Sequence, residues 1–404
     1  MTVMRRWKQQ IPEGVQDFLP DECYNKRRIE DKLRKIFYKC GYDEIDTPMF
    51  EYLDVFSGSK ASIEQEQMYK FFEPGNRIMV LRPDITMPIA RIAATKLKSQ
   101  TLPIRLSYIS SVYRYEELQS AKQREVAQAG IELLGAKGSE ADAEVIAAAI
   151  ESFIALGLSE FQIDIGQVEF FKGLVEEAGL TDIEAEDLRH LIDQKNMLAL
   201  EILLKQLSIS PEIKNNLLSL PMLFGNGNML KETMKLSRNE RSLRALENID
   251  QVYGILKNYG LSKYITFDLG MVQSLNYYTG IIFRGITKDL GYPICGGGRY
   301  DNLMAEFGLD IPATGFAMGI KRVLIALERQ HGLVQLPGID ILFVHDGIQD
   351  SRGYQMIQQL RSEGHRVEVY MAVDSDMDVK VYAKQKGIKR VIIVSNESIE
   401  DIRV

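Results

Sequence analysis

The chain has 404 residues, of which 45% are hydrophobic and 26% are charged, and its 49 Lys and Arg against 56 Asp and Glu give a formal net charge of −7. This is ordinary globular composition, which excludes disordered, collagen-like and membrane-embedded classes, and the length allows about two to three domains. A net acidic chain is also poorly suited to binding nucleic-acid phosphates through bulk charge.

Cysteines, histidines and known motifs exclude further classes. Cys23, Cys40 and Cys295 are odd in number and widely spaced, so they form neither a disulfide framework nor a CxxC pair. The four histidines are scattered, and the chain has no GxxxxGK[ST] loop, GxGxxG turn after a strand, GxSxG elbow or HExxH motif. We therefore expect no metal and no cofactor.

The first residues of the chain and the lack of a long apolar run indicate the cellular location that we expect. The start, MTVMRRWKQQIPEG, is basic but has no apolar core of a signal peptide, and no run of 18 apolar residues occurs. We expect a cytoplasmic protein that does not contact membranes.

The first hundred residues are predicted to alternate between helix and strand. Apolar residues at helical spacing after Pro20 predict a helix over 21–40, followed by a short strand. The polar stretch 57–67 is typical of a loop. A strand over 77–82 then leads through Pro83 into a helix from Thr86 to Lys98.

Two neighbouring segments predict an antiparallel strand pair. Residues 104–116 are rich in β-branched and aromatic residues, and residues 124–134 alternate strictly in character. A polar connection over 117–123 joins them. The alternation places Ala127, Ala129, Ile131 and Leu133 on one face and Arg124, Val126, Gln128, Gly130 and Glu132 on the other.

The rest of the chain divides into three parts. A helix over 139–156 and a strand over 160–166 precede an almost wholly helical stretch, about 181–260, which indicates an inserted helical subdomain. Strands return at 264–269 and 276–284.

The chain is predicted to contain two domains, a core over 1–327 and a small α/β domain over 339–404, joined by a linker over 328–338. In the small domain, strands alternate with helices. The strands are 339–345, 366–371 and 390–394, and the helices are 350–363 and 377–386.

The polar face of the strand pair suits a small zwitterion beside a phosphorylated ligand. Carboxylates such as Asp84, Glu116 or Glu132 could hold an ammonium or imidazolium group, and Arg114 could hold a carboxylate or phosphate. The alternative is that these are ordinary solvent-facing strand positions. The glycines before Arg299 likewise indicate either close approach of a ligand or a tight turn.

Taken in order, these segments resemble the class II aminoacyl-tRNA synthetases, and specifically the histidyl-tRNA synthetase family, over about residues 10–327. The matching segments are IPEGVQDFLP (11–20), the dimer-forming motif 1 (21–48), LRPDITMPIAR (81–91), motif 2 (112–135), NYYTG (276–280), GGGRYDNL (296–303) and motif 3, GFAMGIKR (315–322). The resemblance implies an α+β fold with an antiparallel sheet core, helices around it and an inserted helical subdomain.

The resemblance also implies a site. It places a histidine pocket at Asp84, Thr86, Arg114, Gln128, Glu132, Tyr277 and Tyr278, and relict nucleotide-facing positions at Glu116, Gln273 and Arg322.

Departures from the synthetase pattern bear on activity. Gln273 stands where the family has an arginine that contacts the α-phosphate during amino-acid activation. Losing one such donor to a developing anion typically costs about 3–4 kcal/mol. The motif 2 loop has Ala121-Lys122 in place of Gly-Arg, and Lys321 replaces an acidic residue. The last 67 or so residues are short for an anticodon-binding domain.

A synthetase-like core without the activating arginine is similar to the regulatory subunits of ATP phosphoribosyltransferase. That resemblance implies no catalysis of its own, dimerisation, assembly with a short catalytic subunit in a hetero-octamer, histidine as effector and no tRNA. It also implies a role at the first step of histidine biosynthesis. A genuine histidyl-tRNA synthetase is the alternative, and a synthetase-like adaptor for another amino acid or RNA is a third.

Overall fold

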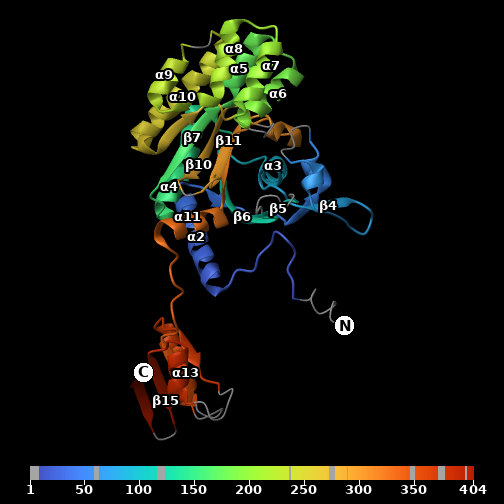
Figure 1. The fold of residues 1–404 in the computed structure, drawn as a ribbon. Coiled ribbons are helices and arrows are strands. Elements are labelled where there is room, and N and C mark those ends of the chain that lie inside the picture. Colours follow the sequence, from blue (N-terminus) through green and yellow to red (C-terminus); the bar gives the residue numbers. More distant parts are fainter. Residues whose placement is uncertain are drawn as a thin grey trace. The chain divides into compact units, whose positions relative to one another are not determined.

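The computed structural model describes residues 9–58, 63–115, 123–235, 238–272, 278–288, 290–345, 351–371, 378–395 and 398–404. The chain forms two compact units, Met1–Leu333 and Val334–Val404. Helices surround a large sheet in the first unit, which confirms the predicted α+β class (Figure 1). Among the residues that the structure describes, no helix combines the length and apolar character that a membrane span requires.

The first unit is built on a nine-stranded sheet. Across the sheet, the order is β1 (Asp43–Glu44), β5 (Ile104–Tyr113), β6 (Glu125–Leu134), β12 (Ala313–Gly319), β11 (Cys295–Arg299), β10 (Ile281–Thr287), β7 (Phe161–Gln167), β9 (Ile265–Asp268) and β8 (Phe224–Gly225). Neighbouring strands are antiparallel except for the pairs β1–β5 and β7–β9. The predicted hairpin is confirmed as β5 and β6, paired from Ile104–Leu134 to Tyr113–Glu125.

One face of this sheet is covered by helices α2 (Pro20–Lys39), α4 (Ser139–Leu156) and α11 (Ile320–His331). The apolar side of β6 points to this face, because Ala129, Ile131 and Leu133 join the core cluster that contains α4. The alternation of the strand therefore sends the even-numbered residues, including Gln128 and Glu132, to the opposite face. The sequence pattern thus predicted correctly which side chains share a face.

The opposite face is covered over β5 and β6 by helix α3 (Thr86–Thr95). Beside α3 lies a three-stranded antiparallel sheet of β2 (Phe50–Tyr52), β4 (Ile78–Leu81) and β3 (Lys70–Phe72), with the short helices η1 (Leu53–Phe56), η2 (Gln65–Gln67) and η5 (Met304–Phe307). Helix α3 ends at Thr95, three residues before the predicted Lys98. Because α3 lies over the large sheet, it shields the polar side chains of β6 on that face from solvent.

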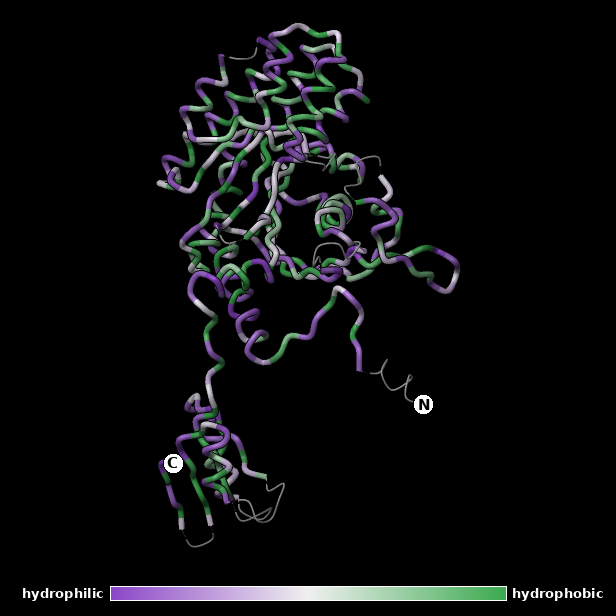
Figure 2. Tube along the Cα trace, viewed as in Figure 1, coloured by the Kyte–Doolittle hydropathy of each residue, from purple (hydrophilic) through white to green (hydrophobic). Residues whose placement is uncertain are grey.

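Helices dominate the inserted region, which lies at the top of Figure 1. Helix α5 (Val168–Ala178) leads into it and η4 (Ser262–Tyr264) follows it. Between them lie α6 (Asp182–Asp193), α7 (Met197–Gln206), α8 (Pro211–Ser219), η3 (Leu220–Met222), α9 (Gly227–Thr233) and α10 (Glu240–Asn258). Side chains that accept hydrogen bonds from first-turn amides start all six of these α-helices, at Gln167, Thr181, Asn196, Ser210, Asn226 and Asn239. Hydrophobic and hydrophilic residues alternate along these helices (Figure 2), so each buries one side.

The second unit is a small α/β sheet with strand order β14 (Val367–Val369), β13 (Ile341–His345), β15 (Arg390–Val394) and β16 (Ile399–Arg403), accompanied by α12 (Ser351–Ser362) and α13 (Val379–Gln385). The predicted parallel strands are present, since β13 pairs in parallel with β14 and β15. Strand β16 was not predicted. It pairs antiparallel with β15, and its residues are mostly exposed. An exposed strand does not need alternating apolar residues, so the sequence carried no strand pattern there.

Two predicted boundaries differ from the structure. Helix α11 continues to His331, so residues 328–331 are helical rather than part of a linker. The reason is tertiary, because Gln330 donates to the Glu160 carbonyl and the His331 ring contacts the Gly157 carbonyl. The strand predicted over 276–284 begins at Ile281 in the part of the chain that the structure describes.

Candidate functional site

The α3-covered face of the sheet has a floor of small residues. Gly315 on β12 lies opposite Glu132 on β6, and Gly298 on β11 lies opposite Gly315. A Cβ atom on Gly315 would overlap the Oε2 atom of Glu132, so only glycine leaves room for this carboxyl group. Gly296 is exposed although it lies within the sheet, and a Cβ there would meet only the Phe283 carbonyl at 3.8 Å. Gly315 therefore makes room for the carboxyl group of Glu132, and the same face of the sheet is open at Gly296.

Glu132 is the most enclosed acidic group on this face, with 2% of its surface exposed. Its Oε1 accepts a hydrogen bond from the Thr86 hydroxyl at 2.8 Å, and its Oε2 accepts one from the Tyr300 hydroxyl. Burial raises the pKa of Glu132 to about 8, against the smaller opposing effect of the two hydroxyls. The carboxyl group is therefore largely protonated at neutral pH and can lose its proton when a cationic group binds.

Three tyrosines enclose the space around Glu132. Tyr108, Tyr278 and Tyr300 belong to one buried cluster and are 2%, 8% and 2% exposed. Tyr108 pairs across the strands with Gly130, where a Cβ would lie 2.5 Å from the tyrosine hydroxyl. Burial, and then the charge of Glu132, raise the pKa of Tyr108. The three rings therefore give the surroundings of Glu132 an aromatic and largely apolar character.

The start of α3 carries the second acidic group. The Asp84 Oδ1 accepts from the Met87 amide at 3.0 Å, which caps the first turn of α3 and fixes the carboxyl group beside Thr86. Burial raises the pKa of Asp84, while the nearby Arg114 guanidinium opposes this rise. Arg114 is itself oriented by a 2.8 Å hydrogen bond from its Nε to the Pro83 carbonyl.

The structure brings most of the predicted pocket together. Thr86 is bonded to Glu132, and Arg114 lies beside Asp84. Glu132, Asp84, Tyr278 and Arg114 are all close enough to Tyr108 to influence its pKa. Gln128 is half-buried and shares the face of Glu132, about 13 Å further along β6 by strand geometry. Tyr277, Glu116 and Gln273 lie outside the described residues.

The solvent-facing interpretation of the polar strand positions is wrong for Glu132. The reason is that α3 and the tyrosine wall cover it, whereas the alternation pattern reports only that the face is polar.

Sequence reasoning missed Tyr108 and Tyr300. Tyr300 follows the glycines and Arg299 directly, and its place at the end of a strand next to the predicted pocket would have been the available signal. Tyr108 lies in the predicted strand 104–116, where aromatic residues are ordinary and give no such signal.

Arg299 serves the fold on the other face of the sheet. Its guanidinium forms a 2.8 Å ion pair with Asp142 of α4 and donates to the Ala136 and Gly138 carbonyls, with 8% of its side chain exposed. The preceding glycines lie in strand β11 rather than in a tight turn, because they pack against the backbones of β10 and β12.

The two basic residues at the start of α11 have protein partners. The Arg322 Nη1 donates to the Pro293 carbonyl at 2.7 Å, and the guanidinium lies 5.2 Å from the centre of the Tyr292 ring. The Lys321 ammonium donates to the Gln16 side chain, and burial lowers its pKa. A nucleotide at this position would have to replace these contacts.

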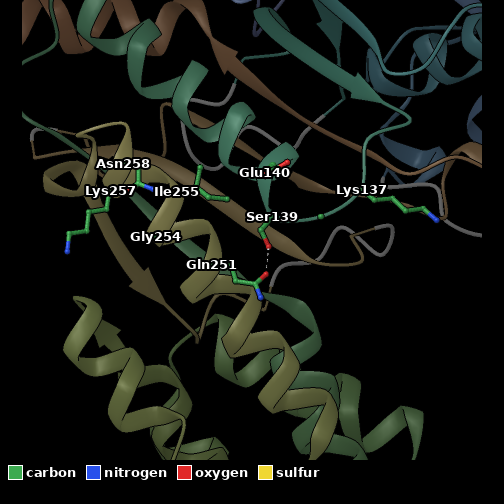
Figure 3. A pocket seen from close by; sticks show the side chains of 9 residues that line it. Lys137, Ser139, Glu140, Gln251, Gly254, Ile255, Lys257 and Asn258 are labelled. Carbon is green, nitrogen blue, oxygen red and sulfur yellow. Dashed lines mark hydrogen bonds between the residues drawn. The ribbon is translucent and has the colours of Figure 1, made fainter.

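A different pocket of about 670 Å³ lies between the start of α4 and the second half of α10 (Figure 3). Ser139 and Gln251 face each other there through a 2.8 Å hydrogen bond. It contains none of the predicted site residues. Within the described ranges, no three or more His, Cys, Asp or Glu are grouped to hold a metal ion.

Comparison with known proteins identifies the family. The ATP phosphoribosyltransferase regulatory subunit of Acetivibrio thermocellus is 48% identical over 398 residues, which is 98% of this chain and 95% of that protein. The regulatory subunit of Ruminiclostridium cellulolyticum is 45% identical, over 97% of this chain and 93% of that protein. The chain belongs to the ATP phosphoribosyltransferase regulatory subunit family.

The regulatory subunit family shares its core with the synthetases. A family model described as histidyl-tRNA synthetase matches residues 14–323. A Bacillus halodurans structure described as an ATP phosphoribosyltransferase regulatory subunit/histidyl-tRNA synthetase superposes with a TM-score of 0.86 at 32% identity, covering 96% of this chain and 99% of that one. A Nostoc histidyl-tRNA synthetase gives 0.78 at 23% identity, over 98% and 96% of the chains, which shows the fold alone. The predicted resemblance is confirmed.

Proposed function

We propose that this chain is the non-catalytic regulatory subunit of ATP phosphoribosyltransferase. It activates a short catalytic subunit at the first step of histidine biosynthesis and takes part in feedback inhibition by histidine. The observation that carries the proposal is the 48% identity to a regulatory subunit over 98% of this chain. Identity of this level over the whole length covers both compact units, not only the synthetase-like core.

The enclosed space on the sheet is proposed to bind histidine, through Asp84, Thr86, Arg114, Gln128, Glu132, Tyr277 and Tyr278. The chemistry of the described residues supports this. Glu132, with a pKa near 8, can pass from the neutral to the charged form when an imidazolium or imidazole N–H approaches. Asp84 suits an ammonium group, and the Arg114 fork suits a carboxylate. Together these groups match a zwitterionic amino acid with a basic ring.

Feedback inhibition requires more than binding. Histidine changes the activity of the complex only if it binds two states of the complex with different affinity. The pocket must therefore differ between the active and inhibited assemblies. We propose that the complex is a hetero-octamer in which this chain also contacts a second copy of itself, and that no tRNA binds.

Synthetase activity is proposed to be absent because Gln273 replaces the activating arginine. The loss of a preorganised cationic donor costs a transition state about 3–4 kcal/mol, or roughly 10²–10³ in rate. The contacts of Arg322 and Lys321 also support the absence of synthetase activity, since both side chains already have protein partners at the position where a synthetase binds its nucleotide.

Histidyl-tRNA synthetase activity is the second candidate, favoured by the match of that family model to residues 14–323. A histidine-dependent ATP–pyrophosphate exchange assay on the purified chain separates the two candidates. Robust exchange would end the regulatory proposal.

The decisive experiment for the regulatory function is to mix the purified chain with a short-form catalytic subunit. We expect co-elution in size-exclusion chromatography and faster formation of phosphoribosyl-ATP. Absence of both co-elution and a rate change would refute the proposal. Adding histidine to the active mixture then tests whether inhibition depends on this chain.

A further inference from the structure

A five-residue turn, 268–272, lies between the tyrosine-walled pocket and the helical insertion, defined here as residues 181–260. It begins at Asp268, the last residue of strand β9, which lies between β7 and the edge strand β8 of the large sheet. Residues of the turn belong to two different buried clusters. Met271 belongs to the cluster of the pocket, whereas Leu269 and Val272 belong to the cluster that contains the insertion. The turn is therefore a direct physical connection between the two regions.

On the pocket side, Met271 packs in the same cluster as Tyr108 and Tyr278. Only 3% of Met271 is exposed, and a Cβ on Gly166 would lie 3.1 Å from its terminal methyl group. Because this region is closely packed, a shift of Met271 would disturb the packing of the cluster that contains the two tyrosines.

On the insertion side, Arg189 of α6 holds the end of the turn. Its Nη1 donates to the Val272 carbonyl at 3.3 Å, and only 13% of its side chain is exposed. Glu186, one turn earlier on α6, accepts from the Arg189 Nε at 2.7 Å and so fixes the guanidinium in this orientation. The contact joins two segments 83 residues apart in the sequence.

The beginning of the turn contacts both the sheet and the insertion. Asp268 is 1% exposed, and its Oδ2 forms an ion pair with Arg284 at 2.9 Å and lies 3.8 Å from the Lys195 ammonium, which belongs to the connection between α6 and α7. The Asp268 Oδ1 accepts from the Gly270 amide at 3.1 Å. Gly270 in turn abuts the insertion, since a Cβ there would lie 2.8 Å from the Leu220 carbonyl.

We propose that the helical insertion sets the affinity of the pocket for its ligand through this turn, with Arg189 and Lys195 as positioning residues. Movement of α6 relative to the sheet would displace the Val272 carbonyl and Met271, and with them the wall that contains Tyr278. A partner or effector that shifts the insertion would thereby change ligand binding, and by reciprocity the ligand would bias the position of the insertion. The inference rests on the proposed histidine pocket for its ligand, but not for the connection itself.

The test uses the full chain with three substitutions. Arg189→Ala removes the donor to Val272, and Arg189→Lys keeps a cation that can reach the carbonyl. Arg244→Ala is the control, because it removes an exposed arginine of the same insertion that forms an ion pair with Glu240 one turn away. Isothermal titration with L-histidine measures affinity, and circular dichroism melting checks folding. We expect Arg189→Ala to weaken histidine binding about tenfold, within the range of measured couplings. Arg189→Lys should recover part of this loss, and Arg244→Ala should bind as the parent chain does.

Hydrogen exchange gives a readout that needs no ligand. In Arg189→Ala, we expect faster amide exchange in peptides covering 264–272 and 278–288, with exchange in 313–327 unchanged. If the parent chain binds no histidine, the ligand assignment fails, and the exchange result alone decides the connection. The inference is overturned if folded Arg189→Ala binds histidine within twofold of the parent chain. It is also overturned if amide exchange is unaltered in both the 264–272 and the 278–288 peptides.

Discussion

The hydroxyl of Thr86, the first residue of α3, donates a 2.8 Å hydrogen bond to the carboxyl group of Glu132 in the middle of the large sheet. This bond joins the helix that covers the pocket to the strand that forms its floor. It also makes the burial of Glu132 tolerable, because a buried carboxyl group without partners is strongly unfavourable. The protonation of Glu132 should therefore be visible in the stability of the ligand-free protein.

The first prediction concerns pH. The pKa of Glu132 is raised from 4.5 to about 8 by burial, so between these values the folded chain holds a proton that the unfolded chain has lost. Stability must then fall as pH rises through this window, by at most about 1.4 kcal/mol per pH unit from this group. The raised pKa of Asp84 acts in the same direction. Glu132→Gln cannot titrate, so its stability should depend less on pH.

Urea denaturation of both proteins at pH 5, 6.5 and 8 measures the difference. The parent chain and Glu132→Gln should diverge in their pH profiles most steeply above pH 5. Parallel profiles would show that Glu132 titrates normally in the folded chain.

The second prediction concerns the glycine opposite Glu132. In Gly315→Ala the new Cβ would overlap both the Glu132 carboxyl group and the Ile131 carbonyl, and a backbone carbonyl inside a sheet cannot move away. Overpacking of this kind costs about 1–3 kcal/mol, and it should also displace the carboxyl group. Gly296→Ala is the matched control, because its Cβ meets only a carbonyl at 3.8 Å. Equal unfolding free energies for the two variants would contradict the assigned packing.

Much of the sheet could be predicted from alternation alone. The pattern in 124–134 placed Glu132 and Gln128 on one face and Ile131 on the other, as β6 has them. Alternation reports which residues share a face, but it does not report what covers that face. The burial of Glu132 follows from α3, whose contact with the sheet is a tertiary event with no local signature.

The glycines before Arg299 illustrate the other limit. Consecutive glycines usually indicate a turn, because they tolerate unusual backbone angles. Here they form part of β11, where Gly297 packs against the Gly315 carbonyl and Phe316 of the next strand. The requirement for small residues arises from the neighbouring strand, so only the assembled sheet reveals it.

The third prediction concerns the buried ion pair between β11 and α4. Arg299 and Asp142 are 8% and 2% exposed, so removing one partner leaves an uncompensated charge in the interior. Arg299→Ala should lower the free energy of unfolding by about 3–5 kcal/mol. The control Arg34→Ala breaks an exposed pair with Glu44 and should cost no more than about 1 kcal/mol. Thermal melting of both variants measures the contrast, and similar melting temperatures would contradict it.

The fourth prediction concerns feedback by histidine in the assembled complex. Glu132→Ala removes the enclosed carboxyl group without altering the surface of the chain, since only 2% of Glu132 is exposed. Complex formation with the catalytic subunit should therefore persist, while half-inhibition should require about 10- to 100-fold more histidine, the loss expected for one charged hydrogen-bond partner. Glu132→Gln keeps a similar shape and one acceptor oxygen but cannot carry a charge, so its half-inhibition should fall between those of the parent chain and Glu132→Ala. Size-exclusion chromatography and inhibition curves for phosphoribosyl-ATP formation provide the measurements. Unchanged inhibition in the intact Glu132→Ala complex would place the histidine sensor elsewhere.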